Sequence, residues 1–392
     1  SNDDGVESFD SNGFTLKNGT YVNDYNASSS TYVAWNWLAG GTAPSQTYTV
    51  KVVSDSGNKY RFDDFGTSAV TLNLQEGGTY TFDQSDSSNS GHPLRFSTTS
   101  DGTHGSGSEY TTNVTTTGTP GSAGAKTVIT VAASAATLYY YCSQHSGMGG
   151  QANTNSTRGS TNLKGNQLST VSANTTAGFS IVSWQFTTSV DNLVGHGLSS
   201  APEMMILKSR TTAYNWDVYH PALSANSKRF ILNGTTTSTG AGAELAGFFD
   251  TAPTSTVFEY NTSALSNNDN VIAYCFHSVE GFSKIGTYSG NNSADGTFVY
   301  TGFRAALVLI KKYNAAGQWW GVYDNARDPD NLVTQRLWWN ATNGESAYSG
   351  DELDFVSNGF KPRGSYDSIN GSGSSYLYLA FAEQPFKFAN AR

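Results

Sequence analysis

The chain has 392 residues, of which 14% are charged, and its formal net charge is -9. A chain of this length exceeds what one hydrophobic core usually supports, so two or three domains are expected. Its Lys and Arg residues are scattered rather than clustered, which argues against binding to nucleic acid. No apolar run approaches the roughly 20 residues of a membrane-spanning helix, so membrane insertion is not expected.

The composition predicts an all-β protein. Gly, Ser, Thr and Asn are abundant, aromatic residues make up 13%, and amphipathic helical windows are missing. This pattern is typical of short strands joined by tight turns. We therefore expect several β-sandwiches in succession.

The first segment, residues 1–41, repeats a pattern found near the end of the sequence. Ser-Asn-Gly-Phe occurs at residues 11–14 and 357–360, and an apolar run follows each copy, at residues 32–35 and 378–381. We expect residues 1–41 to be the terminal hairpin of an upstream β-domain. Its missing strands would come from another chain or from polypeptide outside this sequence, because exposed sheet edges attract partners.

Residues 43–150 have their own alternating strand pattern and contain one set of residues with metal chemistry. A strand precedes His92, and the loop after a later strand contains Cys142, His145 and Met148. Two imidazoles and a thiolate in a plane, with a weak axial thioether, form the ligand set of a mononuclear copper site for electron transfer.

Over residues 43–150 the chain resembles the cupredoxins. His92 corresponds to the early histidine ligand of that family and Cys142 to its thiolate ligand. His145 corresponds to the second imidazole and Met148 to the axial ligand. The resemblance implies a small Greek-key β-sandwich with copper as cofactor. The alternative is that the fold has been kept and the metal lost, with Cys142 a buried apolar residue.

The remaining chain contains a segment without apolar periodicity and then a repeat. Residues 151–177 are rich in Asn, Thr and Gly and are predicted to be a linker or an extended strap along the surface. Residues 178–281 and 282–392 are predicted to be two related halves of a β-sandwich region. We expect each half to cover an apolar face of the other. The matching segments are residues 201–208 and 304–311, followed by residues 215–219 and 318–323.

Other candidate sites have simpler explanations. The adjacent pairs Trp319-Trp320 and Trp338-Trp339 could bind sugar, with one member of each pair facing outward, although aromatic residues on strands are mostly core residues. Cys142 and Cys275 are expected to be unpaired. No nucleophile, base and acid recur in a catalytic pattern, so we do not expect an enzyme.

The second half of the chain resembles the terminal domains of large structural proteins of marine tailed phages, some of which carry cupredoxin-like inserts. The segments that resemble them are residues 139–151, 196–208, 273–281 and 380–386. The resemblance implies a virion surface protein, either a tail fibre or a capsid-surface fibre. We expect a homo-oligomer, with a trimer favoured, that contacts other virion proteins and a host glycan or protein. A secreted copper protein for electron transfer and a carbohydrate-binding adhesin are the alternatives.

Overall fold

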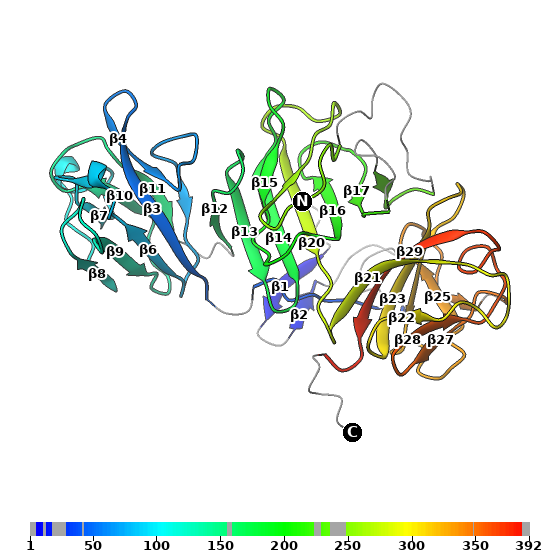
Figure 1. The fold of residues 1–392 in the computed structure, drawn as a ribbon. Coiled ribbons are helices and arrows are strands. Elements are labelled where there is room, and N and C mark those ends of the chain that lie inside the picture. Colours follow the sequence, from blue (N-terminus) through cyan, green and yellow to red (C-terminus); the bar gives the residue numbers. More distant parts are fainter. Residues whose placement is uncertain are drawn as a thin grey trace. The chain divides into compact units, whose positions relative to one another are not determined.

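The computed structural model confirms the all-β class (Figure 1). No helix among the described residues has the length and hydropathy of a membrane span. The chain divides into two compact units, Ser1–Trp37 and Leu38–Arg392. The structure describes residues 5–10, 13–17, 29–40, 43–154, 159–222, 229–235, 248–347 and 349–385.

The first unit contains a hairpin of β1 (Val6–Asp10) and β2 (Gly13–Leu16), in which Phe9 lies opposite Phe14. The hairpin of β27 (Leu353–Val356) and β28 (Gly359–Pro362) has the same register, as expected from the repeated sequence. The terminal hairpin expected for residues 1–41 would use the apolar run at residues 32–35 as a strand. This expectation is wrong, because none of the described residues 29–40 is in a strand. A strand forms only where a neighbouring strand accepts its backbone hydrogen bonds, and no described strand pairs with this segment.

Residues 43–154 form a sandwich of two sheets, with strand orders β4-β3-β6-β9-β8 and β5-β11-β10-β7. Apolar side chains from both sheets share one core, among them Tyr48, Phe82, Phe96 and Leu138. The strands are β3 (Ser45–Ser54), β4 (Asn58–Phe62), β5 (Leu72–Asn73), β6 (Thr79–Asp83), β7 (Leu94–Ser97), β8 (Val114–Thr117), β9 (Lys126–Thr130), β10 (Leu138–Cys142) and β11 (Gly150–Asn153).

The linker predicted at residues 151–177 is wrong. This segment supplies most of β11 to the sandwich, and β12 (Ser160–Asn162) and β13 (Ser169–Asn174) to the next sheet. Short polar side chains do not prevent ladder pairing, because the backbone makes those hydrogen bonds. The segment also bonds to the sandwich, since the Tyr48 hydroxyl donates to the Thr161 carbonyl at 3.0 Å.

The tandem repeat predicted for the second half of the chain is confirmed. One sheet contains the order β14-β20-β16-β17-β18 and the other β21-β29-β23-β24-β25, so equivalent strands are neighbours in both. The strands are β14 (Phe179–Gln185), β16 (Met204–Ser209), β17 (Asp217–Tyr219), β18 (Phe230–Ile231), β20 (Asn270–Phe276), β21 (Ser283–Ser289), β23 (Ala305–Lys312), β24 (Trp320–Asp324), β25 (Gln335–Trp338) and β29 (Ser375–Ala382).

The register agrees as well. Met205 lies opposite Tyr219 in the first repeat, and Val308 lies opposite Tyr323 in the second. Counting back three residues from each tyrosine makes Trp216 equivalent to Trp320, whereas the sequence alone left Trp319 and Trp320 as alternatives.

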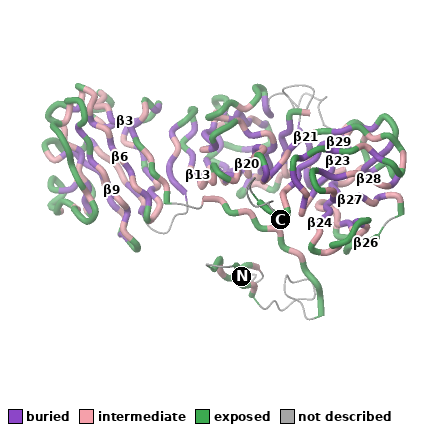
Figure 2. The backbone as a smooth tube through the Cα atoms, turned by 60° about the horizontal axis from the view of Figure 1, so that its bottom comes forward, coloured by how far each residue is buried: buried purple, intermediate pink, exposed green. Residues whose placement is uncertain are grey.

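Each repeat buries its own core, which corrects the expectation that the two halves cover each other. In the first repeat, a small sheet of β15 (Leu193–Gly195) and β19 (Val257–Glu259) packs Phe258 against Trp184 of the large sheet. In the second, β22 (Val299–Tyr300), β28 and β27 do the same with Phe360 against Tyr288. Buried positions therefore follow the strands within each repeat (Figure 2).

Candidate metal centre

Strand pairing brings the first two predicted copper ligands together. Antiparallel pairing of β10 with β7 places Cys142 opposite Leu94, two residues after His92. The backbone N–H of Ser143 then donates to the Pro93 carbonyl at 3.1 Å, which continues the ladder toward His92. A thiol and an imidazole that are far apart in the sequence thus meet at the same end of the sheet.

The third ligand, His145, completes a compact group with these two. The Cys142 Sγ lies 3.8 Å from Nδ1 of His92 and 3.8 Å from Nδ1 of His145. The two imidazole rings are tilted against each other with centroids 4.6 Å apart. Within the described residues, this is the one group of at least three His, Cys, Asp and Glu ligand atoms that all lie within 4.8 Å of one another.

The loop of residues 143–149 carries His145 and depends on glycine at two positions. Gly147 has a φ of +72°, a conformation that L side chains rarely adopt. A Cβ on Gly149 would lie 1.7 Å from the Tyr140 carbonyl oxygen, so a side chain there would displace the loop from β10. The Gly147 N–H donates to the Asp101 carboxylate at 2.9 Å, which fixes the other side of the loop.

Met148 is buried in the same hydrophobic cluster as Cys142, with 1% of its surface exposed. Its carbonyl accepts a hydrogen bond from the Tyr60 backbone N–H at 3.0 Å, which ties the end of the loop to β4. The thioether is therefore held inside the sandwich. Its role as a weak axial ligand remains a prediction.

Sequence reasoning missed the residues that hold His92 in place. The buried Gln84 amide donates to the His92 carbonyl at 2.8 Å and accepts from the Leu94 N–H at 3.0 Å. The Tyr60 hydroxyl donates to the same His92 carbonyl at 2.9 Å. Burial, and then the neighbouring Cys142, raise the pKa of Tyr60, so its hydroxyl stays protonated and can donate. Gln84 follows a strand and has no sequence signal that distinguishes it from a turn residue.

Burial also changes the pKa of His92, the candidate histidine ligand that lies deeper in the site. His92 is partly buried and His145 is exposed, while Cys142 is fully buried. Burial, followed by the nearby His145, lowers the pKa of His92. The neutral imidazole that a metal requires is therefore favoured at neutral pH. A third imidazole, His104, contacts the Cys142 carbonyl through Nε2 at 3.0 Å and fixes the backbone behind the sulfur.

A family model with the description "Domain of unknown function (DUF7483)" matches residues 1–63 and 90–385. The chain belongs to this family. The matched segments include His92, Cys142, His145 and Met148. Searches of curated proteins and of solved structures gave no match. Membership in the DUF7483 family therefore assigns no activity, and proposals for the chain depend on its geometry.

The tryptophan pairs of this family member divide between core and surface. Trp320 is fully buried and its Nε1 donates to the Ile231 carbonyl at 3.1 Å, so it cannot contact a sugar. Trp319 is partly exposed, which confirms that one member of this pair faces outward. Trp338 and Trp339 are both partly exposed, because β25 ends at Trp338 and strand alternation no longer applies. Sugar binding by the three partly exposed rings stays a prediction.

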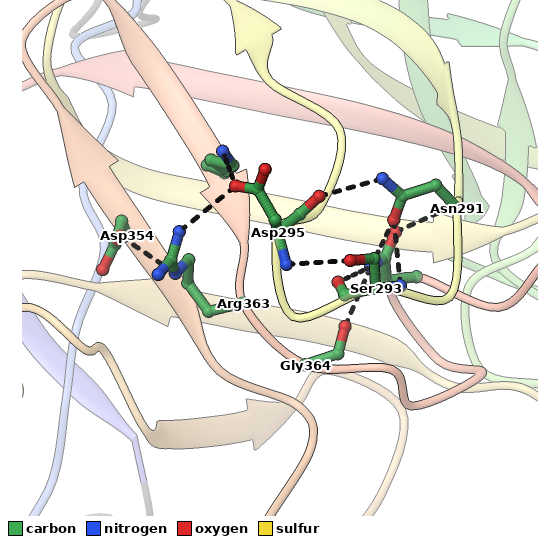
Figure 3. A network of polar contacts seen from close by, with 8 residues as sticks. Asn291, Ser293, Asp295, Asp354, Arg363 and Gly364 are labelled. Carbon is green, nitrogen blue, oxygen red and sulfur yellow. Dashed lines mark hydrogen bonds and ion pairs between the residues drawn. The ribbon is translucent and has the colours of Figure 1, made fainter.

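The polar groups near Asp295 form hydrogen bonds and ion pairs with one another (Figure 3). These bonds account for the described groups of the network without a catalytic role. The buried Asn370 amide donates to the Asn291 side chain and to the carbonyls of Ser293 and Gly364, at 2.8 to 3.0 Å. A hydrogen bond from the Lys361 ammonium to Asp295 lowers the pKa of that carboxyl. The network fixes a turn of the second repeat.

Proposed function

We propose that residues 43–154 bind one copper ion through His92, Cys142 and His145, as in a cupredoxin. The observation that carries this proposal is the pair of equal 3.8 Å separations between the Cys142 sulfur and the two Nδ1 atoms. Metal–nitrogen and metal–sulfur bonds of about 2.05 and 2.3 Å at about 120° place N and S about 3.8 Å apart. Both sulfur–nitrogen separations therefore match those of a trigonal plane of one sulfur and two nitrogens.

The donor set also suits the chemistry of copper. Thiolate favours Cu(I) and imidazole binds both oxidation states, so a bound ion would carry single electrons. Strand pairing holds Cys142, and hydrogen bonds from Gln84 and Tyr60 hold His92. His145 lies in a loop that the hydrogen bond from Gly147 to Asp101 fixes. These supports limit the movement of the ligands between the two oxidation states. The exposed His145 would be the point at which an electron donor or acceptor makes contact.

The copper proposal is tested by titrating Cu(II) into the purified chain while its visible spectrum is recorded. We expect an intense sulfur-to-copper charge-transfer band that saturates at one ion per chain. Cys142→Ser should remove the band, and Cys275→Ser should keep it, because Cys275 lies in a different core. Absence of the band in the wild type, or its survival in Cys142→Ser, would contradict the proposal.

For the whole chain we propose a structural role in a tailed-phage particle, as a tail fibre or capsid-surface fibre that contacts the host surface. The tandem β-units with one strand order support a repetitive structural architecture. The β1–β2 hairpin leaves Phe9 72% exposed, whereas the equivalent Phe355 is 1% exposed. An uncovered copy of a normally buried hairpin supports assembly with other chains.

This role is tested by mass spectrometry of purified particles and by the solution mass of the isolated chain. The chain should be found in particles at a constant copy number, and the isolated chain should be an oligomer, with a trimer expected. A copper-loaded monomer that is absent from particles would favour the secreted electron-transfer protein instead. Retention on immobilised glycan without any particle association would favour an adhesin.

A further inference from the structure

A polar pocket of about 410 Å³ lies on the outer face of the sheet that contains β13, β14 and β20. Its size falls within the range of about 300–1,000 Å³ that is usual for small-molecule sites. Eight of the residues around it carry amide or hydroxyl groups, one is an arginine, and none is a carboxylate. The lining therefore carries a positive charge, whereas the chain as a whole has a net charge of -9.

Strand register places the main polar side chains on one face. Thr170 of β13 lies opposite Ser183 of β14, and Gln185 of β14 lies opposite Asn270 of β20. Directly opposed residues share a face, and so do residues two apart on one strand. The Arg210 N–H donates to the Asn270 carbonyl at 2.7 Å, which continues the ladder beyond β16. The sheet thus presents two hydroxyls, two amides and a guanidinium side by side.

Most of these groups are free to bind a ligand. Thr170 accepts a hydrogen bond from the Asn73 amide at 2.7 Å, and Asn73 forms one wall. The side chains of Ser183, Gln185, Asn270 and Arg210 make no hydrogen bond or ion pair with any residue that the structure describes. They are attached to paired strands, so little backbone ordering would be needed on binding.

The carboxylate of Asp269, which lies between Asn268 and Asn270 of the pocket lining in the sequence, is already hydrogen-bonded and forms no ion pair with Arg210 among the described residues. Asp269 accepts hydrogen bonds from the hydroxyls of Thr211 and Thr212 and from the Ser266 N–H, at 2.6 to 2.8 Å. These hydrogen bonds, from Thr211 first, lower the pKa of Asp269 and keep it ionised.

The amide, hydroxyl and arginine side chains that line the pocket match the groups of a sugar that carries a carboxylate. Amides and hydroxyls each offer a donor and an acceptor, which matches the hydroxyl groups of a saccharide. The planar guanidinium of Arg210 suits bidentate binding of a carboxylate. Leu168 is 37% exposed and offers an apolar surface for the C–H face of a sugar ring, whereas Trp184 and Val271 belong to the core.

We infer that this pocket binds an acidic saccharide, with Arg210 on the carboxylate and with Ser183, Gln185 and Asn270 on the hydroxyl groups. The second repeat lacks the site. The equivalent of Arg210 there is Tyr313, whose N–H donates to the Ser375 carbonyl at 2.9 Å. The equivalent of Gln185 is Ser289, opposite Ser375, and among the described strands β21 has no neighbour that corresponds to β13.

The test uses the full chain and two named probes, trigalacturonic acid and a neutral galactotriose, with affinities measured by calorimetry and ligand-detected NMR. We expect the acidic trisaccharide to bind at least 10-fold more tightly than the neutral one. Arg210→Gln should remove this preference, and Gln185→Ala should weaken both probes several-fold. Lys126→Gln, which removes one exposed positive charge from β9, is the matched control and should change neither affinity.

Equal binding of both probes by the wild type, an unchanged preference in Arg210→Gln, or no binding of either probe up to roughly 10 mM would overturn the inference. Circular dichroism of each variant separates loss of the site from loss of the fold. The measurement needs neither copper nor phage particles, so its outcome is distinct from the tests of the proposed function.

Discussion

The sandwich of residues 43–154 and the first repeat, residues 178–281, contain the same number of thiol and imidazole side chains. Each has one cysteine and three histidines. In the sandwich, two imidazoles lie 3.8 Å from the sulfur of Cys142. In the repeat, Cys275 has apolar neighbours, and burial raises its pKa to about 12. Equal composition therefore gives a candidate metal site in one unit and a packed core in the other.

The difference follows from where each cysteine lies on its strand. Cys142 is the last residue of β10, so the following loop can bring His145 to the sulfur. Cys275 lies inside β20 and pairs with Ser180 on one side and Met205 on the other. Neighbouring strands occupy the space on both sides of it. A cysteine at the end of a strand can gain ligands from a loop, whereas one inside a sheet cannot.

The largest expected effect is a metal-dependent gain of stability confined to the sandwich. At a copper concentration about 1,000-fold above Kd, binding should add about 4 kcal/mol to the free energy of unfolding. Hydrogen exchange of peptides from residues 43–154 measures this locally. Cys142→Ser should abolish the gain, and Cys275→Ser should keep it. An equal gain in the peptides of the first repeat would contradict the contrast between the two units.

The next effect concerns acid and the histidines of the repeat. Burial lowers the pKa of both His196 and His220 to about 4 from an ordinary 6.5. In each, Nδ1 accepts a backbone N–H, from Leu198 and Ala222 respectively, so a proton on Nδ1 would break that bond. Because the folded pKa lies below the unfolded one, each histidine's stabilisation is present above pH 6.5. It is lost as the pH falls toward 4, at about 3 kcal/mol each.

His220→Asn can keep an acceptor near the same N–H but cannot titrate. It should therefore reduce the loss of unfolding free energy between pH 7 and pH 4.5 by about 2.5 kcal/mol, as measured by urea unfolding at both pH values. Asp217 has the opposite effect on stability in acid, because burial raises its pKa to about 6 and its protonation favours the folded state as the pH falls. The acid-induced loss of unfolding free energy in the variant is therefore compared with that in the wild type, since Asp217 contributes equally to both. An identical acid dependence in both proteins would show that His220 is not the responsible group.

Much of this arrangement could be predicted from residues with strong local signals. The order His92, Cys142, His145 indicated the metal group, and repeated Ser-Asn-Gly-Phe turns indicated the equivalent hairpins. The strands in residues 151–177 could not be predicted, because their stability comes from backbone pairing with distant strands. Trp320 and Trp319 look alike in the sequence, and only the register of β24 shows that Trp320 is buried.

The smallest predicted effect concerns Gln84, which sequence reasoning missed and which positions His92 without being a ligand. Gln84→Met keeps a similar volume but removes the bonds to the His92 carbonyl and the Leu94 N–H. The Tyr60 hydroxyl still donates to that carbonyl, so the loss should be partial. We expect a decrease of about 1–2 kcal/mol in the free energy of unfolding, as measured in urea, and an approximately 10-fold weaker copper affinity.

The control for this variant is Gln144→Met, at an exposed position in the ligand loop. It should change neither quantity by more than about 0.5 kcal/mol, the usual range for surface substitutions. Gln84→Glu separates the two bonds of Gln84 at a pH at which the introduced carboxyl is ionised, because a carboxylate still accepts from the Leu94 N–H but cannot donate to the His92 carbonyl. If Gln84→Glu weakens copper binding there as much as Gln84→Met, the bond to His92 is the one that matters. If it binds as tightly as the wild type, the bond from Gln84 does not determine the position of His92, and Tyr60 and the strand pairing do.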